Sequence, residues 1–253
     1  MWPREKIRLF VDAPLGEGKS IALGRDQAHY LFGVMRLGAG ARVALFNGAD
    51  GEWTAEVAEA GKKGGTLSCL GRSAAQLDPP DLWLMFAPIK KARTDFIVEK
   101  AAEMGAARIL PVVTEFTNSE RVNVERLQAH AVEAAEQCGG TFVPPVAAPQ
   151  KLSTALDAWP AERRIMFADE ALAGGSSGPS PLFAAGADEA PMGRRGGPWA
   201  ILIGPEGGFS SAERARLHKM PEAHPVALGP RILRADTAAV AALTLWQSAL
   251  GDW

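Results

Sequence analysis

The pattern of hydrophobic and polar positions changes near residue 75. Before that point, short alternating runs separated by glycine-rich turns predict strands. A short helix is expected at Arg25–Val34, where a few apolar side chains share one face. So many strands in so short a stretch favour a small β-barrel. The expected strands are Ile7–Val11, Arg42–Phe46, Glu52–Ala58 and Thr66–Leu70.

From Asp81 onward, apolar strands alternate with helices, a pattern that predicts an α/β domain with a mostly parallel sheet. Asn123 is expected to cap one helix, Ser210 with Glu213 another, and Asp236 or Thr237 the last. The expected strands are Leu82–Pro88, Arg108–Val113, Arg163–Ala168, Trp199–Ile203 and Pro225–Leu228, and the expected helices are Thr94–Met104, Val124–Cys138 and Thr237–Leu250.

Two domains are therefore expected, at residues 1–74 and 81–253. The segment between them ends in Pro79 and Pro80, and a proline pair continues neither a strand nor a helix. Residues 173–198 are rich in glycine, proline and serine, which predicts a mobile surface loop inside the second domain.

Composition narrows the functional classes. The 253 residues carry a net charge of −2, which excludes a protein that binds nucleic acid through bulk charge but leaves a local basic face possible. Cys69 and Cys138 lie far apart with no CxxC pair, so we expect reduced thiols and no metal site. No signal peptide and no apolar run of membrane-spanning length is visible. We expect a soluble, cytoplasmic protein with no membrane partner.

The most informative run is Ile201–Glu213, in which an apolar strand ends in a glycine-rich turn and a capped helix follows. Glycines at 204, 207 and 208 would let a ligand approach the backbone. Ligands of α/β sheets bind at the carboxyl ends of the strands. The run matches neither dinucleotide nor triphosphate fingerprints. A tight turn without a ligand explains the pattern equally well.

A second run, Leu228–Val240, joins a Gly-Pro turn to an arginine-bearing segment and an alanine-rich helix. The alanines indicate close core packing, or a helix contact in a dimer. Lys90, Lys91 and Arg93 directly follow a strand, where they could meet phosphates or form a solvated loop. The histidines lack metal-ligand spacing, which favours structural or surface roles.

Several ordered runs along the chain carry a family resemblance. They are His29–Arg36, Glu99–Gly105 with Ile109–Pro111, Glu133–Gly139 with Val143–Pro144, Ile203–Gly208, and Leu228–Arg234 with Thr237. Taken in order, these runs resemble the RsmE-type 16S ribosomal RNA (uracil-N3) methyltransferases of the SPOUT superfamily. The resemblance spans about residues 7 to 250. It departs at Gly140, where the family usually has arginine, and at Asp236, where glutamate is commoner.

The resemblance implies a PUA-like β-barrel that helps to hold RNA, followed by a SPOUT-like α/β domain with a trefoil knot. It implies transfer of a methyl group from S-adenosylmethionine to N3 of a uridine in 16S rRNA, within the small ribosomal subunit. It also implies a homodimer.

It further implies roles for individual residues. Arg234 is expected to contact the uracil or its phosphate and Glu206 to orient it, and these are the candidate catalytic residues. RNA-binding is expected of Arg36, Lys90, Lys91 and Arg93. Cofactor-binding is expected of Leu202, Gly204, Pro205, Gly207, Gly208, Leu228, Gly229, Ile232, Leu233 and Thr237.

Three alternatives stay open at this stage. The chain could be a SPOUT-fold methyltransferase for another RNA, although the N-terminal signature argues against that. A non-catalytic RNA-binding or ribosome assembly factor would be expected to lose the 204–208 glycines or Arg234, and both are present. A metabolic nucleotide-binding enzyme would leave the small barrel unexplained.

Overall fold

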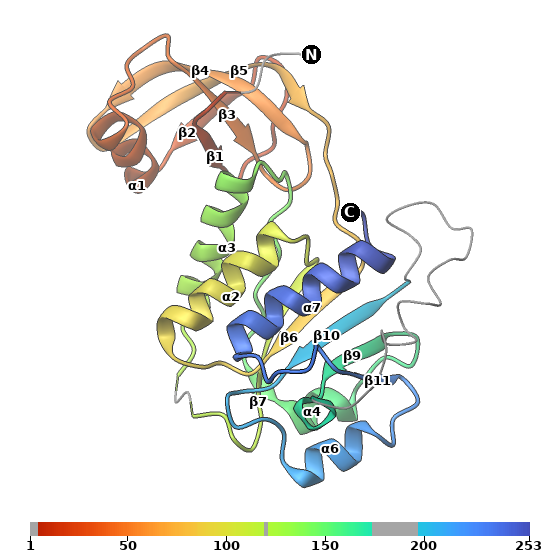
Figure 1. Cartoon of the computed structure of the whole chain (residues 1–253). Coiled ribbons are helices and arrows are strands. Elements are labelled where there is room, and N and C mark those ends of the chain that lie inside the picture. The colour runs from red at the N-terminus through yellow and green to blue at the C-terminus, as the bar shows by residue number, and fades with distance from the viewer. Residues whose placement is uncertain (1–4, 119–120, 174–196) are drawn as a thin grey trace. The chain divides into compact units, whose positions relative to one another are not determined.

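The computed structural model describes residues 5–118, 121–173 and 197–253 (Figure 1). The chain divides into two compact units, residues 1–78 with 135–143, and residues 79–134 with 144–253. The loop expected at 173–198 lies almost entirely outside the described residues. The inclusion of 135–143 in the first unit was not indicated by any sequence pattern.

The first unit is a β-sheet with the order β1-β3-β4-β5-β2. The N-terminal β domain is confirmed, although β1 and β2 stand at the two ends of this order, so strand pairing alone does not close a barrel. The sheet packs around a core that includes Leu31 and Leu67. Its elements are β1 (Arg8–Phe10), β2 (Ser20–Leu23), α1 (Arg25–Ala28), the π-helix η1 (His29–Val34), β3 (Arg42–Phe46), β4 (Glu52–Gly61) and β5 (Gly64–Ala74).

The carboxyl end of α3 (Val124–Cys138) belongs to this first unit. The Arg8 guanidinium, which is 8% exposed, donates to the carbonyls of Glu136 (2.9 Å) and Gly140 (2.6 Å) and pairs with buried Glu52 at 2.7 Å. The backbone N–H of Phe10 donates to the Glu136 side chain at 2.9 Å. A cation at a helix C-terminus satisfies free carbonyls and opposes the helix dipole. These contacts fix Glu136 and Gly140 against β1.

The second unit is a sheet with the order β11-β9-β10-β6-β7-β8, and its neighbouring strands are parallel. The predicted α/β class is therefore confirmed, while the trefoil knot stays a prediction. The elements are β6 (Leu82–Phe86), α2 (Lys91–Glu103), β7 (Arg108–Val113), β8 (Gln150–Lys151), α4 (Leu152–Asp157), β9 (Arg164–Ala168), the 3-10 helix η2 (Glu170–Leu172), β10 (Trp199–Ile203), α6 (Ser211–Leu217), β11 (Ala223–Val226) and α7 (Ala235–Leu250).

Helices cover both faces of this sheet. On one face α7 packs against α2 and β10 (Figure 1). Ala239 and Ala242 of α7 are fully buried, so the alanine-rich pattern serves core packing. On the other face Leu152 of α4 and Leu217 of α6 join a core with Phe167 and Leu202. The carboxyl ends of β9, β10 and β11 come out at the same edge, as parallel pairing requires.

The expected caps were right in two cases and wrong in one. Asn123 accepts from the Arg126 N–H at 2.9 Å, and Ser210 and Glu213 form the expected capping box. The cap predicted for α7 was wrong, because Arg234 occupies the N-cap position and no side chain caps the helix. Asp236 lies inside the first turn instead. Arg234 has an extended backbone conformation, and α7 begins directly after it at Ala235, two residues earlier than expected.

Of the described helices, none is both long and apolar enough to cross a membrane. The described residues contain no cluster of three or more histidine, cysteine, aspartate or glutamate side chains that could hold a metal ion. Cys69 is buried and Cys138 is exposed, and both are free.

Candidate functional site

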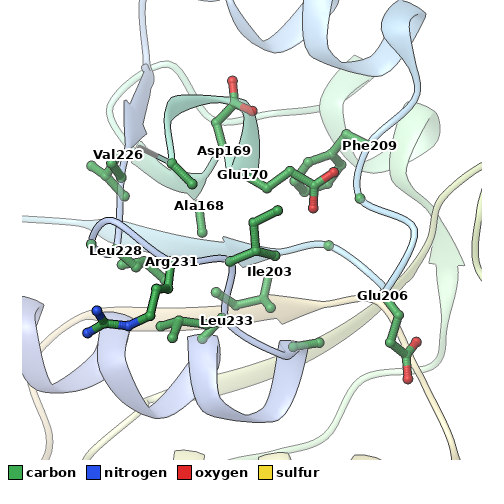
Figure 2. A pocket seen from close by; sticks show the side chains of 18 of the residues that line it. Ala168, Asp169, Glu170, Ile203, Glu206, Phe209, Val226, Leu228, Arg231 and Leu233 are labelled. Atoms are coloured by element: carbon green, nitrogen blue, oxygen red, sulfur yellow. The ribbon is translucent and has the colours of Figure 1, made fainter. Parts of the chain in front are cut away.

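A cavity opens at the carboxyl edge of the parallel sheet (Figure 2). Three chain segments wall it, one after each of the neighbouring strands β9, β10 and β11. Open α/β sheets bind their ligands at this edge, outside the carboxyl ends of the strands. The lining residues are Ala168, Asp169, Glu170, Ala173, Ile203, Gly204, Pro205, Glu206, Gly208, Phe209, Val226, Ala227, Leu228, Gly229, Arg231, Ile232, Leu233, Ala235 and Ala238.

The segment after β10 is the glycine-rich turn. Its shape depends on Gly208, whose φ of +68° is strained for any residue with a side chain. The Gly208 N–H donates to the Pro205 carbonyl at 2.9 Å and closes the turn. The capping box of Ser210 then starts α6. The turn therefore forms one wall of the cavity.

The segment after β11 supplies most of the apolar lining. Leu228, Ile232 and Leu233 all face the cavity. Ile232 is 74% exposed, which is unusual for a large apolar side chain and suits a residue that is covered when a ligand binds. Gly229 has a φ of +125° and turns the chain toward α7. An apolar slot of this kind accepts a planar ring such as a purine.

The segment after β9 adds acidic groups. The Asp169 side chain is completely buried and accepts hydrogen bonds from Arg214 and His218, both at 3.1 Å. Burial alone would raise the pKa of Asp169, but these bonds and one from the Ala171 N–H lower the pKa below its usual value. Asp169 is therefore ionised and bonded away from the cavity. Its neighbour Glu170 faces the cavity.

A second hollow, which we call the basic hollow, adjoins this cavity through Glu206. Ile89, Lys90, Lys91 and Asn118 line the rest of it. Lys90 and Lys91 are both exposed and lie at the start of α2. Two exposed ammonium groups beside a ligand cavity can hold a polyanion such as a nucleic acid backbone.

Comparison with known proteins agrees with this geometry. Residues 77–247 match the RNA methyltransferase domain family, and residues 23–68 match the RNA methyltransferase PUA domain family. The small-subunit ribosomal RNA methyltransferase E of Rickettsia conorii is 29% identical, with 93% of each chain covered. The Synechocystis protein of the same name is 31% identical over 88% of this chain and 71% of its own length.

The chain belongs to the small-subunit ribosomal RNA methyltransferase E family.

Solved structures of relatives share the fold over the whole chain. The Neisseria gonorrhoeae methyltransferase E, bound to S-adenosylmethionine, is 25% identical with a TM-score of 0.83, over 98% of this chain and 99% of its own. A Legionella pneumophila methyltransferase, also with bound S-adenosylmethionine, is 26% identical with the same TM-score, over 98% of this chain and 100% of its own. The family predicted from the ordered motifs is confirmed.

Many of the residues that the family resemblance selected come together at the cavity. Arg234 does not line it and instead stands exposed at the start of α7, and Thr237 and Gly207 also lie outside the lining. Leu202 is buried in the core on the α4 and α6 face. The residues that do line the cavity are Gly204, Pro205, Glu206, Gly208, Leu228, Gly229, Ile232 and Leu233.

The predicted RNA-contacting residues lie in both units. Lys90 and Lys91 line the basic hollow, whereas Arg93 is 3.6 Å from Asp236 and forms an ion pair. In the first unit, Arg36 is exposed and has a φ of 55°, two residues after the end of the π-helix η1. π-Helical turns and strained non-glycine residues concentrate at functional positions.

Sequence reasoning did not identify the segment at the end of β9, which we call the β9 wall, as part of the site. Ala168, Asp169 and Glu170 end an ordinary apolar strand, and nothing local marks them as part of a site. A usable signal did exist, because polar residues at the end of a parallel strand are candidates for ligand contact. Arg231 and Phe209 were also missed as lining residues.

Proposed function

We propose that this enzyme uses S-adenosylmethionine to methylate N3 of a uridine in 16S rRNA, presented within the small ribosomal subunit, and that it works in the cytoplasm. The observation that carries the proposal is the cavity between the glycine-rich turn and the Leu228–Leu233 segment, in a chain of this methyltransferase family. The basic hollow beside it supplies a place for the RNA backbone.

The cavity fits S-adenosylmethionine. Leu228, Ile232 and Leu233 offer an apolar slot for adenine, and the glycine-rich turn forms the neighbouring wall for the rest of the molecule. A Cβ atom on Gly208 would lie 1.8 Å from a Glu170 oxygen, so only glycine leaves room for the Glu170 carboxylate at this wall of the cavity. When bound, the cofactor supplies an activated methyl group on a positively charged sulfur.

The protein's remaining work concerns the uridine. N3 carries a weakly acidic proton and takes part in base pairing, so the base must leave its helix and its N3 proton must be removed. Arg234, exposed at the start of α7, is proposed to stabilise the negative charge that develops on the uracil. Glu206, shared by the cavity and the basic hollow, is proposed to orient the base. Correct placement alone can contribute roughly 7–11 kcal/mol.

We also propose a homodimer and RNA contacts from Lys90, Lys91 and Arg36. The outer face of α7 carries Leu245, which is 38% exposed and available to a second copy. Light scattering tests this arrangement. The wild type is expected at twice the mass of the 26.8 kDa chain, and Leu245→Asp is expected to lower the measured mass.

The deciding experiment supplies the purified enzyme with isotopically labelled S-adenosylmethionine and unmodified small ribosomal subunits. Digestion to nucleosides and mass spectrometry should yield labelled 3-methyluridine. A label on another nucleoside, or on a different RNA offered in parallel, would favour a methyltransferase with another target. Tight binding to subunits without any label would favour an assembly factor.

A further inference from the structure

The β9 wall places a carboxylate directly over the glycine-rich turn. Glu170 begins η2. Its Oε1 lies so close to Gly208 that a Cβ atom on residue 208 would be only 1.8 Å from it. Figure 2 shows the Glu170 side chain extending toward the Phe209 segment, while the carboxylates of Asp169 and Glu206 turn away from the middle of the cavity. Glu170 is thus the acidic side chain best placed to meet a ligand there.

The position of Glu170 is set by contacts far away in the sequence. The Asp169 N–H donates to the Val226 carbonyl at 3.1 Å, and the Asp169 carboxylate accepts from the Ala171 N–H at 3.2 Å. Arg214 and His218, at α6 and directly after it, hold the same buried carboxylate. These contacts fix the backbone at Asp169, directly before Glu170, and so place Glu170 beside the cavity before any ligand arrives.

The second observation is that the negative charge of Glu170 has no partner among the described residues. The Glu170 side chain is exposed, and within the described part of the chain no donor or cation pairs with its carboxylate. The lining arginine, Arg231, lies on the opposite side of the cavity in Figure 2. An unpaired carboxylate at the mouth of a partly enclosed cavity attracts positive charge more strongly than one in open water.

We propose that Glu170 is a specificity residue of the cofactor cavity, where its carboxylate faces the positively charged sulfur of the methyl donor. This inference rests on the proposed use of S-adenosylmethionine. The donor carries a sulfonium, whereas the demethylated product, S-adenosylhomocysteine, carries a neutral thioether. The two molecules are otherwise alike, so a carboxylate at this place favours the donor and weakens retention of the product.

Calorimetric titration with each of these two molecules tests the assignment without any turnover. Glu170→Gln keeps the side-chain shape and removes the charge. It should raise the Kd of S-adenosylmethionine about tenfold, equivalent to about 1.4 kcal/mol, and change the Kd of S-adenosylhomocysteine less than about twofold. Glu170→Asp keeps the charge and should retain most of the preference for the donor.

Glu162→Gln is the matched control, because Glu162 is an exposed residue before the opposite end of β9 and lies outside the cavity. It should leave both affinities unchanged. Equal weakening of donor and product by Glu170→Gln would overturn the proposal, and so would an unchanged affinity for both. If the wild type binds neither molecule, the proposed function itself fails. If the wild type binds both and Glu170→Gln binds them normally, only this inference fails.

Discussion

The two sides of the cavity are built in different ways. The glycine side comprises the turn after β10 and the segment after β11, and its shape follows from local features such as the positive φ angles of Gly208 and Gly229. The acidic side, Asp169 and Glu170, depends on partners in α6 and β11 that lie some 45 to 57 residues away. Local geometry can be recognised in a sequence, whereas geometry imposed by distant partners needs the fold.

The largest effect on catalysis is expected at Arg234, which follows the glycine side. A substitution there should change the rate of methyl transfer but not the affinity for the cofactor. Arg234→Ala should lower kcat roughly 100-fold, because it removes a cation from the developing uracil charge. The Kd of S-adenosylmethionine should change little, since Arg234 does not line the cavity. Single-turnover kinetics with titration of the cofactor measure both. Equal losses in rate and cofactor affinity would assign Arg234 to cofactor binding or to the fold.

The acidic side should contribute most to stability. Asp169→Asn should lower the free energy of unfolding by about 2 kcal/mol, because charge-assisted hydrogen bonds to Arg214 and His218 are weakened. Urea denaturation measures this loss. Asp157→Asn is a fair comparison, since Asp157 is 71% exposed and pairs with Arg216 on the surface, and it should cost far less.

The loss at Asp169 should also depend on pH in a predictable direction. Its folded pKa lies below the ordinary 3.8 of an unfolded aspartate, so ionised Asp169 stabilises the fold above that pH. The stability gained is lost as pH falls from 3.8 through the folded pKa. Denaturation across this range should show the wild type converging on Asp169→Asn. A constant gap between the two proteins would contradict the ionised assignment.

The glycine side should respond to the addition of a single methyl group. Gly208→Ala places a side chain at positive φ, where strain costs about 1–2 kcal/mol, and forces the Glu170 carboxylate to move. Cofactor affinity should fall about tenfold by titration. Gly207→Ala is the control, because no positive φ is required there and the new Cβ, 3.2 Å from the Phe116 Cβ, asks only for a small shift of Phe116. Comparable losses in both variants would remove the special role of Gly208.

The smallest effects are expected in the basic hollow. Lys90→Gln and Lys91→Gln should each weaken small-subunit binding a few-fold and make the salt dependence of binding shallower by about one ion. Cofactor affinity should not change. Lys219→Gln, an exposed lysine outside the hollow, should alter neither quantity. If all three lysine variants behave alike, the hollow has no specific RNA contact.

Much of the fold could be predicted from local signals. The bounds of β7, β10 and α3 agree with those expected, because each is a run of uniform period with clear ends. Strand β2 was missed since only four residues pair with β5. The short elements β8 and α4 were missed for a similar reason. Strand β11 ends two residues earlier than expected, because the apolar residues that follow it line the cavity.

The site was predictable where family motifs and glycines coincide, as at Gly204 and Gly208. It was not predictable where a residue's importance comes from a distant partner. Asp169 looks like any polar residue after a strand until Arg214 and His218 reach it. Glu170 can be recognised as part of the site only once the fold shows its carboxylate packed against Gly208.

The most direct test of the cavity as a cofactor site built from both sides is one set of calorimetric titrations. Wild type, Gly208→Ala and Glu170→Gln are each titrated with S-adenosylmethionine, and the wild type also with ATP and NAD. We predict saturable binding of S-adenosylmethionine to the wild type and weaker binding of it to both variants. We predict that neither ATP nor NAD binds to the wild type. Equal binding of ATP or NAD, or unchanged affinity in both variants, would contradict the account.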